Sequence, residues 1–403
     1  MLRLLPLVLG AFAVGAETFM ISGVLPQIAA DLRVSDAAAG SLVTVFALAY
    51  AFGSPLIAVA TAGVERKRLL IAAIGAFALA NLIAAVAPNC VGLAAARAAL
   101  ALSAGAFIPA AVAFATALFQ PERRGRAIAT IYAGMTLATV FGVPGGTYLA
   151  ALAGWRAPFV GVALLAALAA AGVALFLPRL PGVVAAGFAA RLAAARRPAV
   201  LQALTLTALA LVGPFAANTF LAVLIEKTLG ADGDRLALTL AFFGLVSFAG
   251  SQFGGYAADR WPREPFLGVV LFVLIGAFAL LSVGPTMGGD GGAELFFIGL
   301  TLWGLFGWAF PIVQQSRLVS LDPAMAPITL SLNVSALYLG VAVGSSLGAA
   351  AMARWSVDAI GLVAAASELA ALAWLVLTGA PQRAPEASEA EAPIAKPRYE
   401  TML

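Results

Sequence analysis

Two ionisable residues lie inside stretches of the chain that are otherwise apolar. Glu17 lies in the run from Leu4 to Pro26, and Arg97 follows Pro88 in the run from 91 to 119. Glu17 lies nine residues before Pro26 and Arg97 nine residues after Pro88, and we assign both prolines to the outer side. In a helix that spacing corresponds to ~13 Å below the outer surface. A charge at such a depth is costly and usually faces a partner or a water-filled cavity, so it often belongs to an ion or substrate path.

Aromatic and polar side chains recur in four apolar runs, 4–26, 91–119, 199–224 and 293–316, and are candidates for lining a cavity. Trp303, Phe306, Phe310 and Gln314 recur at helical spacing, so one helix face could carry them together. Such a face suits an apolar or amphiphilic solute. For any single aromatic residue, packing or a lipid-facing position is the competing interpretation. The candidates are Phe19, Met20, Phe107, Phe215, Asn218, Trp303, Phe306, Trp308, Phe310 and Gln314.

Two further polar residues lie in apolar runs, and we expect structural roles for both. Glu368 has no charged partner within the runs of its half, and Gln252 is a polar neighbour that it could contact. A lone carboxyl in hydrocarbon is usually neutral, which favours a structural role. Asn333 is expected to hold two helices together rather than to bind a ligand.

The elements that must position these residues are helices long enough to cross a membrane. The 403 residues are 63% hydrophobic and 10% charged, whereas soluble domains carry about 25% charged residues. About 20 apolar residues in a helix cross the ~30 Å hydrocarbon core. We therefore predict an all-α polytopic membrane protein with twelve spans, at 4–26, 37–60, 69–87, 91–119, 127–151, 157–177, 199–224, 236–257, 266–284, 293–316, 328–353 and 358–379.

The loops predict how these spans are oriented. With the N-terminus in the cytoplasm, seventeen of the 23 Lys and Arg residues fall on the cytoplasmic side and five on the outer side, with Arg97 within a span. The positive-inside rule then places both termini in the cytoplasm. We expect a six-helix bundle at 1–177, a cytoplasmic linker at 178–198 that could hold a short amphipathic helix, a second six-helix bundle at 199–380, and a disordered cytoplasmic tail at 381–403.

The composition also excludes several classes of function. The sequence has no histidine and one cysteine, Cys90, so the usual zinc sites, a Ser-His-Asp triad and an intrachain disulfide are excluded. We predict neither a cofactor nor a metal, and the absence of a sizeable extramembrane domain argues against a membrane enzyme. Basic residues are not interleaved with aromatic ones in an exposed stretch, so we expect no nucleic-acid partner.

Several motifs, taken in order, resemble one known family. GAETFMISGVLPQIAADLRVS, GLAAARAALALSAGAF, YAGMTLATVFGVPGGTYLAALAGWR and QQSRLVSLDPAMAPITLSLNVSALYLGVAVGSSLG are similar to its first, fourth, fifth, and tenth and eleventh helices. GGYAADR is similar to its G-x-x-x-D-R loop. The chain up to about residue 380 thus resembles the major facilitator superfamily, specifically its twelve-span drug:proton antiporters of the arabinose-efflux-permease type. The resemblance implies two six-helix bundles that work by alternating access.

The resemblance also implies residues that gate the transport cycle, although two motifs depart from the family pattern. Thr61 replaces the usual aspartate in the first-half loop, and Val143 splits the contiguous Gly-Pro of the fifth-helix motif. Small residues repeat every four positions in the fifth span and let a partner helix approach closely. The expected gating residues are Gly142, Pro144, Gly146, Gly255, Asp259 and Arg260.

In the resembled fold the first and fourth helices both line the central cavity, so Glu17 and Arg97 are expected to pair. The functional interpretation is a proton switch, in which Glu17 binds the proton and Arg97 tunes it. The competing interpretation is a static ion pair, or an arginine that snorkels outward.

The resulting function is proton-coupled efflux of a small organic solute or drug. The alternative is proton-coupled or facilitated uptake of a sugar or nucleoside-like solute, which would use the same fold. We expect a monomer in the lipid bilayer of a bacterial-type inner membrane, driven by the proton gradient without a cofactor. The sequence does not select the substrate.

Overall fold

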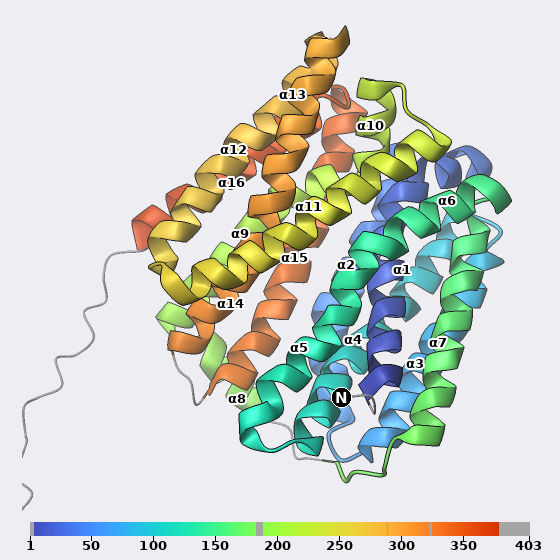
Figure 1. Cartoon of the computed structure of the whole chain (residues 1–403), viewed down its shortest axis with the longest axis vertical. Coiled ribbons are helices and arrows are strands. Elements are labelled where there is room, and N and C mark those ends of the chain that lie inside the picture. The colour runs from blue at the N-terminus through green and yellow to red at the C-terminus, as the bar shows by residue number, and fades with distance from the viewer. Residues whose placement is uncertain (1–3, 183–187, 288, 322–324, 379–403) are drawn as a thin grey trace, which may run out of the picture.

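Helices make up nearly all of this chain in the computed structural model (Figure 1), which describes residues 4–182, 188–287, 289–321 and 325–378. Within these ranges twelve helices are long and apolar enough to cross a membrane. The predicted all-α polytopic fold with twelve spans is therefore confirmed. Arg3 and the predicted tail from 381 lie outside the described residues.

The first half of the chain supplies six spans. Its elements are α1 (Leu5–Leu32), α2 (Asp36–Ala60), α3 (Arg66–Ala85), α4 (Cys90–Leu118), α5 (Pro121–Leu137), the π turn η2 (Ala138–Gly142), α6 (Val143–Ala153) and α7 (Arg156–Phe176). The fifth span is continuous through α5, η2 and α6. An eight-residue helix, α8 (Phe188–Ala195), lies in the predicted linker.

The second half supplies the other six spans. Its elements are α9 (Pro198–Thr219), α10 (Leu221–Leu229), α11 (Gly233–Arg260), α12 (Arg263–Met287), α13 (Gly289–Leu302), the π turn η3 (Trp303–Gly307), α14 (Trp308–Leu321), α15 (Ala326–Arg354) and α16 (Ala359–Thr378). The tenth span runs through α13, η3 and α14.

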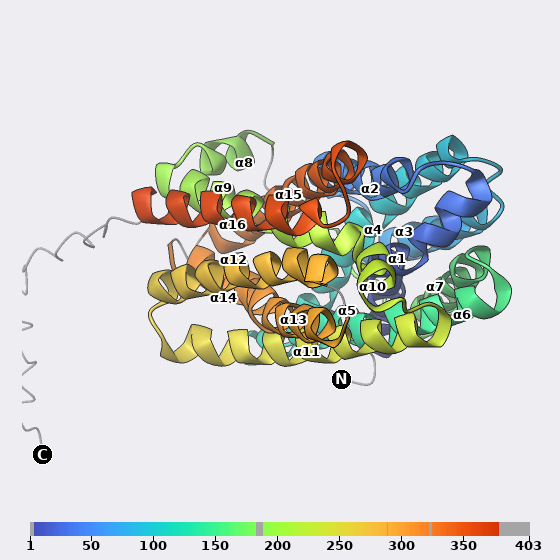
Figure 2. The same cartoon turned by 90° about the horizontal axis from the view of Figure 1, so that it is seen from above.

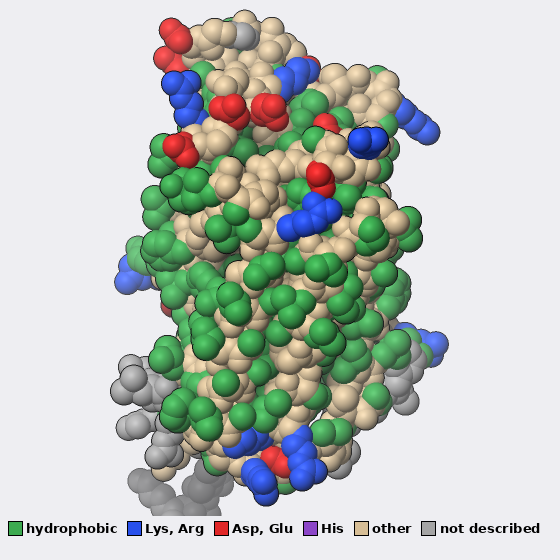
Figure 3. All heavy atoms as spheres, turned by 90° about the vertical axis from the view of Figure 1, so that its right-hand side faces the viewer, with side chains coloured by type: hydrophobic (Ala, Val, Ile, Leu, Met, Phe, Trp, Pro, Cys, Tyr) green, Lys and Arg blue, Asp and Glu red, His purple; other side chains and the backbone are tan. Residues whose placement is uncertain are grey.

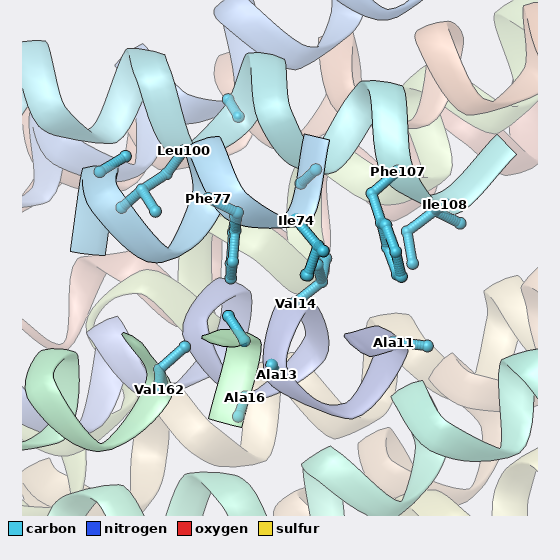
Figure 4. Packing of buried hydrophobic residues seen from close by; sticks show 14 of the residues in the cluster. Ala11, Ala13, Val14, Ala16, Ile74, Phe77, Leu100, Phe107, Ile108 and Val162 are labelled. Carbon is cyan, nitrogen blue, oxygen red and sulfur yellow. The ribbon is translucent and has the colours of Figure 1, made fainter. Parts of the chain in front are cut away.

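Each half has its own apolar core. One cluster of buried residues comes mainly from the helices between Leu4 and Leu177, and the other mainly from those between Leu206 and Leu375. In the first core Phe77 and Phe107 are fully buried, and they pack with small side chains of α1 such as Ala11 and Ala13 (Figure 4). Alanine-rich helix faces allow close helix packing, which drives association where lipid removes the hydrophobic effect.

Several predicted helix ends are wrong, two of them because proline or glycine was read as a stop. The first span continues through Pro26 to Leu32, and the segment Gly284–Gly292 is helical to Met287 and again from Gly289. Transmembrane helices tolerate an internal proline because neighbouring groups satisfy the carbonyl it frees. The turn between α12 and α13 depends on Gly289, whose φ of 60° suits glycine.

The two halves meet along two pairs of helices, α2 with α15, and α11 with η2 and α6. Thr44 and Ser345 share a hydrogen bond of 2.7 Å between their hydroxyl oxygens, and Gly40 lies against the ring of Phe220. These contacts belong to the ends of the helices remote from the N-terminus of α1. Figure 1 shows α11 crossing α6 near the top and separating from α5 towards the bottom, and Figure 2 shows the two halves side by side. The halves are therefore in contact at one end and spread at the other.

Charged side chains gather at the two ends of the molecule, with apolar side chains between them on the face shown in Figure 3. We call the end that carries Arg66, Lys67 and Arg68 the basic end, and the other the opposite end. At the opposite end Arg156 pairs with Asp31 at 2.5 Å and Lys227 with Asp358 at 2.9 Å. This distribution agrees with helices that cross a bilayer between two aqueous sides.

Candidate functional site

Glu17 of α1 and Arg97 of α4 form a buried ion pair, with Arg97 Nη1 donating to Glu17 Oε1. Both residues are 0% exposed. The predicted contact is therefore confirmed, although α1 ends later than the depth argument assumed. Each member of the pair can still form another hydrogen bond, because Glu17 Oε2 and Arg97 Nη2 have no hydrogen-bond partner in the described part of the chain. A buried charged pair of this kind can change partners when a proton or a solute arrives.

Arg97 makes two further contacts, both with α2. Its Nε donates to the backbone oxygen of Leu42 at 3.4 Å, and its guanidinium carbon lies 4.3 Å from the centroid of the Phe46 ring. A guanidinium over an aromatic face is a cation–π contact, which is stronger where water is excluded. Arg97 thus connects α4 to both α1 and α2.

Phe46 belongs to an aromatic cluster that spans both halves. Tyr50 of α2 stacks on Tyr338 of α15, with ring centroids 3.9 Å apart and an interplanar angle of 20°. The Phe46 ring lies 6.2 Å from each of these two rings. The phenol of Tyr338 lies within electrostatic range of Glu17, Arg97 and Tyr132 of α5. Sequence reasoning missed these residues. The signal was available, because phenols near the middle of apolar spans are uncommon and the chain has only six tyrosines.

Three of the predicted cavity residues, Phe19, Phe215 and Trp308, lie where the halves face each other. Phe19 of α1 contacts Trp308 of α14 with ring centroids 5.6 Å apart. Phe215 of α9 packs against the cores of both halves. Asn218, one turn further along α9, is half-buried. Phe19, Trp308 and Phe215 are therefore positioned to meet a solute that enters between the halves.

Four other predicted cavity residues are buried in packing contacts instead. Met20 lies beside Gly146, and Phe107 lies against Gly10. Trp303 packs on Phe243, and Phe310 belongs to the core of the second half. These four residues are at most 2% exposed, so we assign them to packing in this conformation.

The predicted aromatic face of the tenth span is not gathered into one surface. Phe306 contacts Phe253 at 5.8 Å between centroids and lines a surface groove with Trp261 and Val269, while Trp303 faces the core. The π turn at Trp303–Gly307 adds a residue to the turn, so residues at helical spacing across it no longer share a face.

Gln314, the last predicted cavity residue, lies in a buried polar network of the second half. Its Nε2 donates to the Ala203 oxygen at 2.8 Å and to Thr207 Oγ1 at 3.2 Å, and Thr207 donates to Asn333 Oδ1 at 2.7 Å. The predicted role of Asn333 in joining helices is confirmed, here between α15 and α9. Gln314 Oε1 is buried without a partner in the described chain.

The expected gating residues fall into two groups. Gly142 lies against Ala16 and Gly146 against Met20, so both belong to the seam between α1 and the fifth span, and Pro144 is the second residue of α6, after the π turn η2. Asp259 and Arg260 are exposed at the basic end, and Arg260 stacks on Tyr256 at 4.3 Å from the ring centroid. Gly255 has open space at its Cβ position. Pairs that do form at this end include Arg317 with Glu264 at 2.8 Å.

Glu368 of α16 is fully buried and faces Gly213 of α9, where a Cβ would lie 2.8 Å from Glu368 Oε1. Gln252, considered from the sequence as its neighbour, is exposed. Neither carboxyl oxygen of Glu368 has a partner in the described residues. In those residues we also find no group of three or more His, Cys, Asp or Glu side chains that could hold a metal ion.

Twelve apolar helices in two six-helix halves, with a charged pair buried near the centre, fit a protein that moves small solutes across a membrane. Residues 7–313 match the model of the Major Facilitator Superfamily, and the chain belongs to this superfamily.

Curated relatives support the same class. The chain is 32% identical over 383 residues to an uncharacterized MFS-type transporter, YbcL of Bacillus subtilis, covering 93% of this chain and 95% of the relative. It is 37% identical over 311 residues to a chloramphenicol resistance protein of Streptomyces lividans, covering 74% and 79%. It is 29% identical to the inner membrane transport protein YdhP of Escherichia coli, covering 86% and 88%.

Solved structures agree on the fold. A D-xylose-proton symporter superposes with a TM-score of 0.75 at 17% identity, covering 92% of this chain and 96% of the symporter. The nucleoside transporter NupG superposes with a TM-score of 0.73 at 13% identity, covering 94% and 100%.

Proposed function

We propose that this protein exports a small organic solute from the cytoplasm in exchange for protons, as a drug:proton antiporter of the arabinose-efflux type. Its basic end would face the cytoplasm, since basic loops remain on that side of an inner membrane. Both termini would then be cytoplasmic, the chain would work as a monomer, and the proton gradient would supply the energy. In this orientation the present conformation is closed to the outside and spread towards the cytoplasm.

The observation that carries the proposal is the Glu17–Arg97 pair. Burying an ionisable pair at the centre of a transporter costs desolvation free energy, and such groups within membrane spans are usually functional. The free Oε2 of Glu17 gives a proton a place to bind, and the free Nη2 of Arg97 can donate to a solute acceptor. Protonation of Glu17 and binding of solute would thus alter the same contact, which is what exchange of one for the other requires.

The solute would bind between the halves, near Phe19, Trp308, Phe215 and Asn218. Aromatic walls with few polar groups suit an amphiphilic molecule. Because the ionised pair is neutral overall, the site favours solutes without a large net charge. The chloramphenicol resistance protein among the relatives makes chloramphenicol the first probe to use.

The test is accumulation of labelled chloramphenicol in a drug-sensitive bacterial host, with and without the gene. We expect lower accumulation and higher resistance in cells that carry the gene, and recovery of accumulation when a protonophore collapses the proton gradient. Glu17→Gln, expressed to the same level, serves as the matched control and should accumulate the drug like the empty host. Faster uptake of a sugar or nucleoside, with no resistance gained in a panel of drugs, would instead support an importer.

A further inference from the structure

The contact between α2 and α15 closes the opposite end, and an aromatic cluster ties it to the ion pair. Gly40, Thr44 and Tyr50 follow one another along α2 towards the centre, and each meets a residue of the second half. The Tyr50–Tyr338 stack is the one of the three nearest the basic end. A separation of α2 from α15 that reaches this point would break the stack.

The stack connects directly to Arg97 through Phe46. The Phe46 ring is 2% exposed, with the guanidinium of Arg97 on it and the rings of Tyr50 and Tyr338 beside it. Tyr50 and Tyr338 are 4% and 9% exposed. Glu17, Arg97, Phe46 and Tyr338 thus form an unbroken series of contacts from α1 to α15. Close-packed side chains with two alternative arrangements can pass a local change to a helix interface.

We propose that Phe46, Tyr50 and Tyr338 are positioning residues that transmit the protonation state of Glu17 to the contact between α2 and α15. The inference rests on the proposed function, because it takes Glu17 as the proton site. These residues contact neither the proton nor, by this account, the solute. They act by holding Arg97 against α2 and α2 against the second half.

The physical chemistry gives the direction of the effect. While Glu17 is ionised, the guanidinium of Arg97 interacts with both the Glu17 carboxylate and the Phe46 ring. When Glu17 takes a proton, Arg97 loses its counter-ion, so its contacts with Phe46 and Leu42 become its main compensation. Arg97 then binds α2 more strongly, which keeps the Phe46 ring against the stack and the opposite end closed. Protonation therefore favours the conformation that is spread at the basic end.

The charged and titratable groups around Glu17 are few. Arg97 comes from α4, and Tyr338 comes from α15. Tyr50 of α2 stacks on Tyr338, and Tyr132 of α5 lies within electrostatic range of both. Because tyrosines stay neutral over the range in which carboxylates titrate, Glu17 is the member of this group that would respond to pH, whereas Asp36 lies in the first turn of α2, away from the stack.

The experiment measures the distance between the halves at the basic end over a pH series. Cys90, the one native cysteine, is replaced by alanine, and spin labels are attached at Val64→Cys and Leu321→Cys, which are exposed positions in the two halves. Pulsed electron resonance then gives the population of the spread conformation. We expect that population to rise as the pH falls, with on the order of a tenfold change in the ratio of the two conformations, as a desolvated cation–π contact implies.

Five variants separate the possible outcomes. Phe46→Leu and Tyr338→Leu should lose most of the pH response, whereas Tyr338→Phe should keep it because stacking needs the ring alone. Phe77→Leu controls for the effect of a cavity, because Phe77 is fully buried in the same core. This variant should leave the pH response intact. A full response in Phe46→Leu would overturn the inference, and so would loss of the response in Tyr338→Phe. A response that persists in Glu17→Gln would instead refute Glu17 as the proton site.

Discussion

At the scale of single residues, the two charges of the central pair depend on each other. Arg97 and Glu17 lie in a region from which solvent is excluded, and the other contacts of Arg97 are a backbone oxygen and an aromatic ring. Removing one member leaves an uncompensated buried charge, whereas removing both leaves two neutral side chains. The pair therefore matters for stability mainly because loss of one member leaves the other as an unpaired buried charge.

This argument predicts a strongly non-additive double-mutant cycle. Arg97→Gln should lower the thermal unfolding midpoint in detergent, in line with a cost of about 3–5 kcal/mol for an unpaired buried charge. Adding Glu17→Gln should recover most of that loss, because the remaining charge is then gone. The measurement is the apparent midpoint of the four proteins under one condition. A double variant as unstable as the sum of the single ones would show that the two side chains do not act as a pair.

At the scale of helices, the seam between α1 and the fifth span has no room for added atoms. A Cβ on Gly142 would lie 2.7 Å from the Cβ of Ala16 and 3.2 Å from its Cα. Gly145, three residues further along, has nothing within 4 Å of its Cβ position. The same substitution at these two glycines should therefore have opposite effects.

We expect Gly142→Ala to destabilise the protein by ~1–3 kcal/mol, the usual range for overpacking. Gly145→Ala should be neutral or slightly stabilising, because alanine favours a helix over glycine by up to ~1 kcal/mol. Thermal unfolding of both variants in the same detergent gives the comparison. Equal midpoints for the two variants would argue against close contact between α1 and the π turn.

Helix number and the central pair could be predicted from the sequence, whereas most of the solute-facing surface could not. Hydrocarbon thickness fixes span length, and an isolated charge in an apolar run needs a partner, so both signals are local. Which face of a helix meets the other half depends on packing between distant segments. The π turn at Trp303–Gly307 changes that face within one span, and the Tyr50–Tyr338 stack joins residues from opposite halves. Neither feature leaves a periodic signal in one helix.

At the scale of the whole molecule, transport requires the halves to separate at the end where they now meet. The Thr44 and Ser345 hydroxyls, 2.7 Å apart, join α2 to α15 at that end. Two cysteines at these positions would be within reach of a disulfide. Cys90→Ala provides a background without other thiols.

In this background, oxidation of Thr44→Cys/Ser345→Cys should form the cross-link and stop transport, and a reductant should restore it. Each single cysteine variant should be insensitive to the same oxidant. Transport of labelled solute into everted vesicles, with the cross-link scored by a mobility shift, checks this. Undiminished transport by fully cross-linked protein would show that α2 and α15 need not separate.

The central claim is that Glu17 couples proton movement to solute movement, and purified protein in proteoliposomes tests it most directly. With chloramphenicol as solute, the wild-type protein should concentrate it against a gradient when a pH difference is imposed. Glu17→Gln should lose this uphill transport but keep exchange of labelled for unlabelled solute at equal concentrations, because alternation and binding remain. Uphill transport by Glu17→Gln at the wild-type rate would contradict the account.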